Sequence, residues 1–102
     1  MMEPPAVARS VNGVPIRLTG ERWQHIIQQH PEMTQKRDDL LEALRTPDTV
    51  YGGHHGTLMA IRREDDLYLV VVYGESGTTD GFVVTSYLTR RPGRRKVVWR
   101  RS

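Results

Sequence analysis

Cysteine is absent from this chain of 102 residues. Without a thiol there can be no disulfide framework, no thiolate nucleophile and no zinc site built from cysteine. The absence says little about the compartment, but it leaves the four histidines as the first candidates for proton chemistry near neutral pH.

Long apolar runs are absent as well. No segment approaches the roughly 20 apolar residues of a membrane-spanning helix, and the start, MMEPPAVARS, lacks a basic segment leading into an apolar one. We therefore expect a protein that has no membrane partner and acts in the cytoplasm. The length fits a single domain with one packed core.

Acidic residues are missing from the end of the chain. None follows Asp80, whereas seven of the fifteen lysines and arginines do, namely Arg90, Arg91, Arg94, Arg95, Lys96, Arg100 and Arg101. One end of the molecule should therefore carry a positive field, suited to phosphate or to an acidic partner. Arginine outnumbers lysine thirteen to two, which fits bidentate phosphate contacts and equally fits a GC-rich genome.

The chain divides into a short N-terminal segment and one domain. Residues 1–15 contain three prolines and the pair Asn12-Gly13 without sustained periodicity. They predict an extended or flexible arm, with room for a short strand near residues 14–18. Residues 16–102 are then expected to form a single α+β domain.

Two helices are predicted in the first half of the domain. Thr19 can cap the first, residues 20–30, and Pro31 ends it. The second is expected to follow a cap at Thr34 and to end at residues 46–47. The apolar stripe of the first helix consists of Trp23, Ile26, Ile27 and His30.

From Val50 the pattern changes to the alternation of strands. The four clearest strands are residues 57–63, 67–73, 81–89 and 96–100. The turn at residues 64–66 is too short for a crossover and requires an antiparallel hairpin. We therefore predict an α+β fold with two N-terminal helices packed on a four- to five-stranded antiparallel sheet, whose last two strands are joined by the basic loop.

The two histidines of the first helix should have different surroundings. His30 lies in the apolar stripe at the helix C-terminus, where the dipole favours an imidazolium, and this suits a general acid. A capping or half-buried histidine without a catalytic role is the simpler alternative. His25 lies about 200° from Trp23 around the helix and is expected to be solvated.

Several familiar sites are not supported by the motifs. The adjacent histidines of GGHHG, residues 52–56, point to opposite sides of an extended chain and lack further ligands at useful spacing. GESGTTDG, residues 74–81, has Asp80 where a phosphate-binding loop needs lysine. No G-x-S-x-G occurs, and the acids do not form the cluster of a magnesium nuclease. We predict neither a metal nor a cofactor.

Hydroxyl groups and arginine can share one face of the predicted sheet. Alternation in residues 81–89 sends Phe82, Val84, Ser86 and Leu88 to one side and Val83, Thr85 and Tyr87 to the other. The same rule separates Arg62 from Arg63, so one of the two accompanies the hydroxyls. A histidine, an arginine and hydroxyls are what RNA cleavage without a metal requires. Thr85 and Tyr87 are also ordinary strand-forming residues, which is the alternative.

Several segments together resemble the phage-type nuclease domains of the barnase, EndoU, colicin and RelE-like (BECR) superfamily. They are LTGERWQHIIQQHPEM, ALRTPDTV, LYLVVVYGE, GFVVTSYLT and the terminal VVW, and the likeness spans residues 16–100. The resemblance implies a metal-independent endoribonuclease with substrate on or beside the sheet. His25 and His30 match its helix motif, and Thr85 and Tyr87 match its strand motif, with Ser86 where alanine is common.

The sequence thus predicts an endoribonuclease-like domain that cleaves RNA by attack of the 2′-OH. The predicted catalytic residues are His30, Thr85, Tyr87 and His25. The predicted RNA-binding residues are Arg62, Arg63, Arg90, Arg91, Arg94, Arg95 and Lys96. Expected partners are RNA and an acidic antitoxin or immunity protein. Two alternatives stay open, a non-catalytic RNA- or protein-binding module of the same fold and a ribosome-dependent toxin of a toxin–antitoxin pair.

Overall fold

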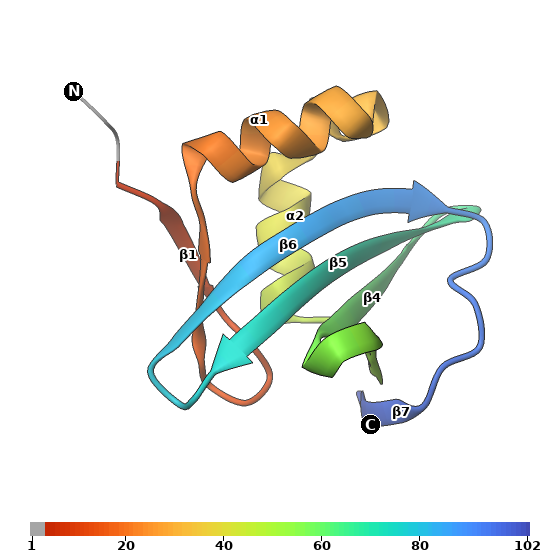
Figure 1. Ribbon diagram of the computed structural model, residues 1–102. Helices are drawn as coiled ribbons and strands as arrows, with labels where there is room; N and C mark the ends of the chain where they lie inside the picture. The colour runs from red at the N-terminus through yellow and green to blue at the C-terminus, as the bar shows by residue number, and fades with distance from the viewer. Residues whose placement is uncertain (1–3) are drawn as a thin grey trace.

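A seven-stranded mixed sheet forms most of the molecule (Figure 1). The computed structural model describes residues 4–102. Along the sheet the strands follow the order β1-β2-β6-β5-β4-β3-β7, and every neighbouring pair is antiparallel except β2 and β6. The strands are β1 (Ala6–Arg9), β2 (Pro15–Leu18), β3 (Thr49–Gly52), β4 (Leu58–Glu64), β5 (Leu67–Ser76), β6 (Asp80–Thr89) and β7 (Val97–Arg100).

The predicted four- to five-stranded antiparallel sheet is therefore wrong. It lacked β1 and β3, which have four residues each and little room for periodicity. It also lacked the parallel pairing of Ile16 with Gly81 and of Arg17 with Phe82. Partners so far apart in sequence leave no local signal. Finally, β7 does not lie beside β6 but pairs with β3 at the opposite edge of the sheet.

Part of the segment predicted as an arm, residues 1–15, forms the edge strand β1 of this sheet. Strand β1 pairs with β2 from Ala6 opposite Leu18 to Arg9 opposite Pro15. Ala8 is only 2 % exposed, because alternation turns it toward the core while its neighbours face outward. The hydroxyl of Ser10 donates to Glu75 and so ties the turn after β1 to the end of β5. Residues 1–3 of the predicted arm lie outside the described residues.

Two short helices cover one side of the sheet, α1 (Gly20–Gln29) and α2 (Arg37–Arg45). The predicted cap of α1 is confirmed, since the Thr19 hydroxyl accepts a hydrogen bond of 3.0 Å from the Arg22 amide. The predicted cap at Thr34 is wrong. Thr34 instead closes the 3-10 turn η1 (Pro31–Met33) by donating to the Pro31 carbonyl, and Lys36 precedes α2. Within residues 4–102, no helix has the length and apolar character needed to cross a membrane.

Apolar side chains pack on both sides of the sheet. The larger cluster lies between the sheet and the helices and includes Ile26, Leu40, Leu44, Leu69 and Tyr73. The smaller cluster lies on the opposite side of β4 and β5, where Met59, Ile61 and Val70 are buried. Side chains that border it are Tyr51, Tyr68, Val72 and Tyr87. We call this second side of β3–β6 the tyrosine face.

A bulge in β6 changes which side chains face the helices. Val72 pairs with Thr85, but the next residue, Tyr73, pairs with Val83, so Val84 is the extra residue. Val83 therefore joins the core, and Phe82 is 45 % exposed. The prediction that placed Phe82 with Ser86 and Leu88 is wrong for this reason. Beyond the bulge the predicted alternation holds, and Ser86 is buried beneath Met33.

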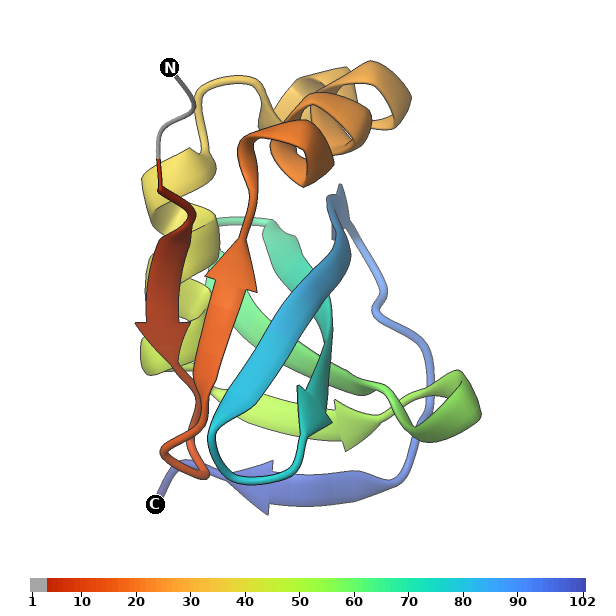
Figure 2. The same ribbon diagram turned by 60° about the vertical axis from the view of Figure 1, so that its left-hand side comes forward.

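The basic segment, residues 90–96, connects β6 to β7 over three intervening strands. Because each neighbour from β6 to β7 is antiparallel, β6 and β7 run in the same direction, and their connection must cross one side of the sheet. Figure 2 shows this segment and α2 on opposite sides of β5 and β6. Seven residues span at most roughly 24 Å. The segment must therefore be nearly extended over the sheet.

Candidate functional site

The centre of the candidate site is a contact between His30 and Tyr87. Their ring centroids are 5.6 Å apart and the ring planes meet at 36°. The 3-10 turn that begins at Pro31 brings Glu32 back, so that its Oε2 lies 3.7 Å from Nδ1 of His30. The His30 side chain is 32 % exposed. The imidazole thus lies beside a phenol and a carboxylate and is still accessible to a ligand.

The free edge of β6 lets His30 reach a residue of the tyrosine face. Strand β2 pairs with β6 only at Gly81 and Phe82. Within residues 4–102 the remainder of β6 therefore has no strand on that side, and α1 lies along it (Figure 1). His30 follows the last turn of α1 and meets Tyr87 near the end of β6. Two of the predicted catalytic residues are brought together in this way.

Thr85 lies on the same face as Tyr87 but is less accessible. It pairs with Val72 on β5, while Tyr87 pairs with Val70. Its hydroxyl oxygen is buried and has no hydrogen-bond partner among residues 4–102. A ligand can reach this hydroxyl only after neighbouring side chains shift. Direct contact with a substrate is therefore easier for Tyr87 than for Thr85.

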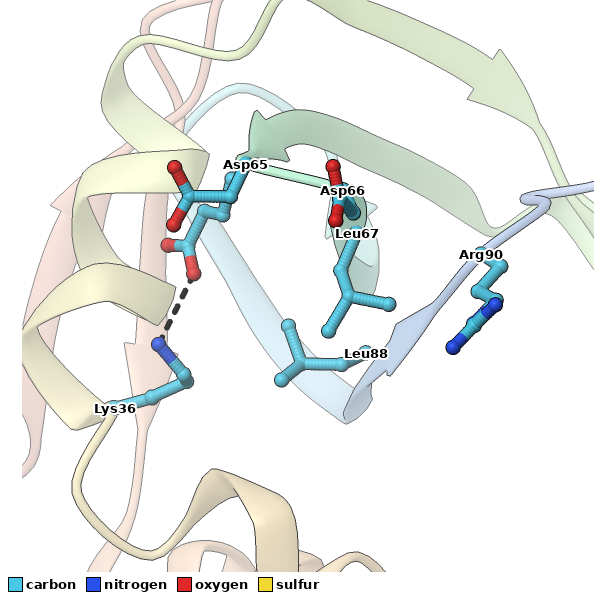
Figure 3. Close-up of a pocket in the computed structure, with 7 residues that line it drawn as sticks. Lys36, Asp65, Asp66, Leu67, Leu88 and Arg90 are labelled. Carbon is cyan, nitrogen blue, oxygen red and sulfur yellow. Dashed lines mark hydrogen bonds and ion pairs between the residues drawn. The ribbon is translucent and has the colours of Figure 1, made fainter.

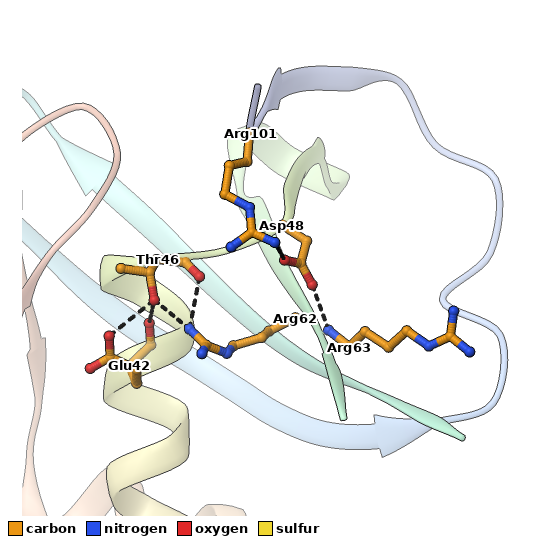
Figure 4. A network of polar contacts seen from close by, with 6 residues as sticks. All are labelled: Glu42, Thr46, Asp48, Arg62, Arg63 and Arg101. Carbon is orange, nitrogen blue, oxygen red and sulfur yellow. Dashed lines mark hydrogen bonds and ion pairs between the residues drawn. The ribbon is translucent and has the colours of Figure 1, made fainter. Parts of the chain in front are cut away.

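The two adjacent arginines of β4 point in opposite directions (Figure 4). Arg62 Nη1 donates to the carbonyl of Thr46 at 3.0 Å and also contacts its hydroxyl, which ties Arg62 to the end of α2. The Arg63 backbone amide donates to Asp48, while its guanidinium lies on the tyrosine face, 5.9 Å from the ring centre of Tyr68. Of the two sequence candidates, Arg63 is the one that shares a face with Tyr87.

The register of the sheet places Arg63 within reach of the His30–Tyr87 pair. Arg63 lies opposite Tyr68, and Tyr68 lies opposite Thr89 on β6. Tyr87 is two residues from Thr89 along the same strand, which puts its Cα roughly 12 Å from that of Arg63 by standard strand spacing. Both side chains are long, so both can contact one phosphate held between them.

The basic segment carries the remaining predicted RNA-binding residues. Arg90, Arg91, Arg94, Arg95 and Lys96 are all exposed. Arg95 Nη1 lies 2.9 Å from Nε2 of His54, and because arginine is always a donor, this nitrogen of His54 is the acceptor. No hydrogen bond among residues 4–102 joins these five side chains to His30 or Tyr87. Their contribution is therefore a positive field on the tyrosine-face side of the sheet.

His25 is not part of this arrangement. It is exposed on α1, and at about 100° per residue it lies roughly 140° from His30 around the helix. Among the described residues no polar or aromatic contact joins it to Tyr87 or Thr85. Its catalytic role stays a prediction that depends on the resemblance.

A hollow of about 320 Å³ lies elsewhere, between the β4–β5 turn and the start of α2 (Figure 3). Lys36 and Glu64 form an ion pair across it at 3.1 Å, and this hydrogen bond raises the pKa of Lys36. Asp65 and Asp66 add negative charge at the rim, which repels a phosphate. No group of three or more residues of metal-ligating type within residues 4–102 is arranged to hold a metal ion. The hollow contains neither His30 nor Tyr87.

Two residues of the site were missed by the sequence reasoning. Tyr68 was treated only as part of a strand, although the register of the β4–β5 hairpin places it opposite Arg63. Glu32 was overlooked because its approach to His30 depends on the turn made by Pro31–Met33. The hairpin register could have identified Tyr68, since the short turn fixes it.

In the comparisons with known proteins, no family model, curated protein or solved structure matches this chain. The resemblance to the BECR nucleases therefore stays a prediction from the motifs.

Proposed function

We propose that this protein is an endoribonuclease that cleaves RNA by attack of the 2′-OH and needs no metal for the step. The observation that carries the proposal is the contact of His30 with Tyr87 on a face that also holds Arg63. A proton carrier, a hydroxyl and a fixed cation are the groups that this reaction requires.

In the proposed reaction the ribose 2′-oxygen attacks the adjacent phosphorus, and the bond from phosphorus to the 5′-oxygen breaks. The 2′-OH gives up its proton to a base, and the 5′-oxygen gains one from an acid. The products are a 2′,3′-cyclic phosphate and a 5′-hydroxyl. His30 carries out one of these transfers. The Glu32 carboxylate lies 3.7 Å from Nδ1, which leaves Nε2 for the substrate.

Arg63 and Tyr87 stabilise the phosphate as it becomes more negative. A guanidinium can donate two parallel hydrogen bonds to phosphate oxygens. The phenol of Tyr87 adds a third donor beside the imidazole. Thr85 lies two residues before Tyr87 on β6, and its buried hydroxyl oxygen has no hydrogen-bond partner among the described residues. We propose that this hydroxyl helps to position the substrate. His25 enters only through the resemblance, and the basic segment holds the flanking phosphates.

The test is cleavage of labelled single-stranded RNA by the purified protein in the presence of a chelator. We expect fragments that end in a 2′,3′-cyclic phosphate, no cleavage when the ribose at the cleaved position is 2′-deoxy, and loss of cleavage in His30→Ala. Cleavage of the deoxy substrate, or an undiminished rate in His30→Ala, would contradict the mechanism.

A second candidate function is non-catalytic binding of RNA or of an acidic protein. The exposed cations of the basic segment favour it, because they can bind phosphates or carboxylates without catalysing a reaction. Binding that weakens steeply with salt, without any product from free RNA, would support this alternative.

A third candidate is a ribosome-dependent toxin held in check by an acidic antitoxin or immunity protein. Cleavage of ribosome-bound message, with free RNA left intact, would separate it from the leading proposal. RNA is the partner in the first and third candidates and in one form of the second, so we propose the cytoplasm as the compartment.

A further inference from the structure

Tyr68 and Arg63 form a pair beside the proposed catalytic residues. They lie directly opposite each other on β5 and β4, and the guanidinium is 5.9 Å from the ring centre. This distance is at the outer limit of a cation–π contact. Arg63 Nε donates to the carbonyl of Asp65 at 3.2 Å, so the side chain is held by the turn rather than by the ring, and a flat ligand can compete for the ring without breaking that hydrogen bond.

The position of this pair suits the nucleotide next to the cleaved phosphate. Tyr87 lies opposite Val70, two residues from Tyr68 on β5. Tyr68 and Tyr87 are therefore diagonal neighbours on one face, with a separation of roughly 7–8 Å. A phosphate held by His30 and Tyr87 would leave the adjoining base over Tyr68, while the edge of the Arg63 guanidinium donates to the phosphate.

The surroundings favour an anionic ligand with flat, partly apolar groups. The apolar floor near Tyr68 consists of Met59, Ile61, Val70 and Val72. The carboxylate of Asp80 shares this face but lies at the other end of β6, where Arg17 pairs with it at 2.8 Å. The basic segment crosses the same side of the sheet (Figure 2). Unpaired bases stack on aromatic and guanidinium planes, whereas the bases of a duplex are already stacked on each other.

We propose that Tyr68, with Arg63, is a stacking subsite for an unpaired nucleobase next to the cleaved phosphate, so that the substrate is single-stranded RNA. This inference rests on the proposed function, because the cleaved phosphate defines the subsite. In this subsite Tyr68 contacts the base and does not contact the reacting atoms.

The experiment measures binding of a short fluorescein-labelled single-stranded RNA whose riboses carry 2′-O-methyl groups, which prevent cleavage. Tyr68→Phe keeps the ring and should bind within about twofold of the wild type. Tyr68→Leu keeps an apolar side chain and should bind on the order of 10- to 100-fold more weakly. Equal binding by the two variants would overturn the stacking subsite.

A second measurement needs no variant and so does not depend on correct folding of Tyr68→Leu. The wild type should bind the same strand with abasic riboses at least about tenfold more weakly than the intact strand, and should bind a duplex of that sequence more weakly than the single strand. Equal affinity for the intact and abasic strands would overturn the subsite, and tighter binding of the duplex would overturn the single-stranded substrate.

These outcomes are distinguishable from failure of the proposed function. If the wild type prefers intact single strands but releases no cyclic phosphate from unmodified RNA, Tyr68 stands as a base-stacking residue of a single-strand binding site and the catalytic proposal fails. If RNA is cleaved and abasic strands bind as well as intact ones, cleavage stands and the stacking subsite fails.

Discussion

The ring of His30 lies 5.6 Å from the ring of Tyr87, although His30 follows a helix on one side of the sheet and the Tyr87 side chain belongs to the opposite side. The contact exists because β2 pairs with β6 only at Gly81 and Phe82, which leaves an edge where His30, the residue after α1, can reach the tyrosine face. The short parallel pairing of β2 with β6, which makes the sheet mixed, therefore also creates the candidate site.

Replacement of His30 with alanine should lower RNA cleavage by about 10² to 10⁴-fold, the usual contribution of one positioned acid or base. The fold should remain, because the side chain is 32 % exposed. Initial rates on labelled RNA and a thermal unfolding curve measure the two effects. His55→Asn is the matched control, since His55 is exposed with φ of 56°, a conformation that asparagine tolerates. A similar loss in both variants would argue against a specific role for His30.

The adjacent arginines of β4 should separate substrate binding from stability. Arg63→Ala should lower kcat/KM by about 10- to 100-fold, the effect of losing a charged hydrogen bond to phosphate, with little change in melting temperature. Arg62→Ala should leave kcat/KM nearly unchanged but lower stability by about 1 kcal/mol, because its bond to the Thr46 carbonyl is lost. Equal kinetic effects at the two positions would remove Arg63 from the site.

Local patterns were sufficient for the last four strands of the chain. The strands expected at residues 57–63, 67–73, 81–89 and 96–100 correspond to β4–β7 within a few residues, and the short acidic turn gave the correct antiparallel hairpin. Both rest on side-chain alternation and loop length, which are encoded locally. The α1 cap at Thr19 follows from an equally local rule.

Arrangement in space was harder to predict than the elements themselves. The pairing of β7 with β3 rather than with β6 depends on the whole sheet, and the bulge at Val84 has no sequence signature that alternation would reveal. The choice between Arg62 and Arg63 needed the register relative to the helices. Glu32 was missed because only the turn after α1 brings it to His30.

The basic segment should determine how strongly RNA binding depends on salt. Each cation that neutralises a phosphate of a single strand contributes about 0.7 to the slope of log K against log salt. The double variant Arg94→Gln, Arg95→Gln should therefore lower the slope by about 1.4. Arg9→Gln, Arg45→Gln removes the same charge from β1 and the end of α2 and should leave the slope unchanged. Fluorescence titrations over a range of salt concentrations give both slopes, and equal slopes would contradict a role for the segment.

Tyr73 should make the protein sensitive to alkaline pH. Burial, and then the nearby charge of Glu75, raise the pKa of this phenol well above its ordinary value of 10.0. Below about pH 10 it is protonated in both states, and above that value the unfolded chain ionises first. The folded state then binds more protons, so stability falls as pH rises. Urea unfolding at about pH 8 and about pH 11 should show a smaller loss in Tyr73→Phe than in the wild type. An identical loss would place the sensitivity elsewhere.

The first strand should be required for stability, contrary to the behaviour of a flexible arm. Ala8 and Val7 are neighbours in β1, but Ala8 is 2 % exposed and Val7 is 46 % exposed. Ala8→Asp would place a carboxylate in the core without a partner and should cost more than about 3 kcal/mol. Val7→Asp introduces the same charge on the outer side of an edge strand and should cost less than about 1 kcal/mol. Chemical denaturation measures both values. If the two substitutions cost the same, β1 does not pack against the core in solution as it does here, and the parallel pairing of β2 with β6 would have to hold that edge of the sheet alone.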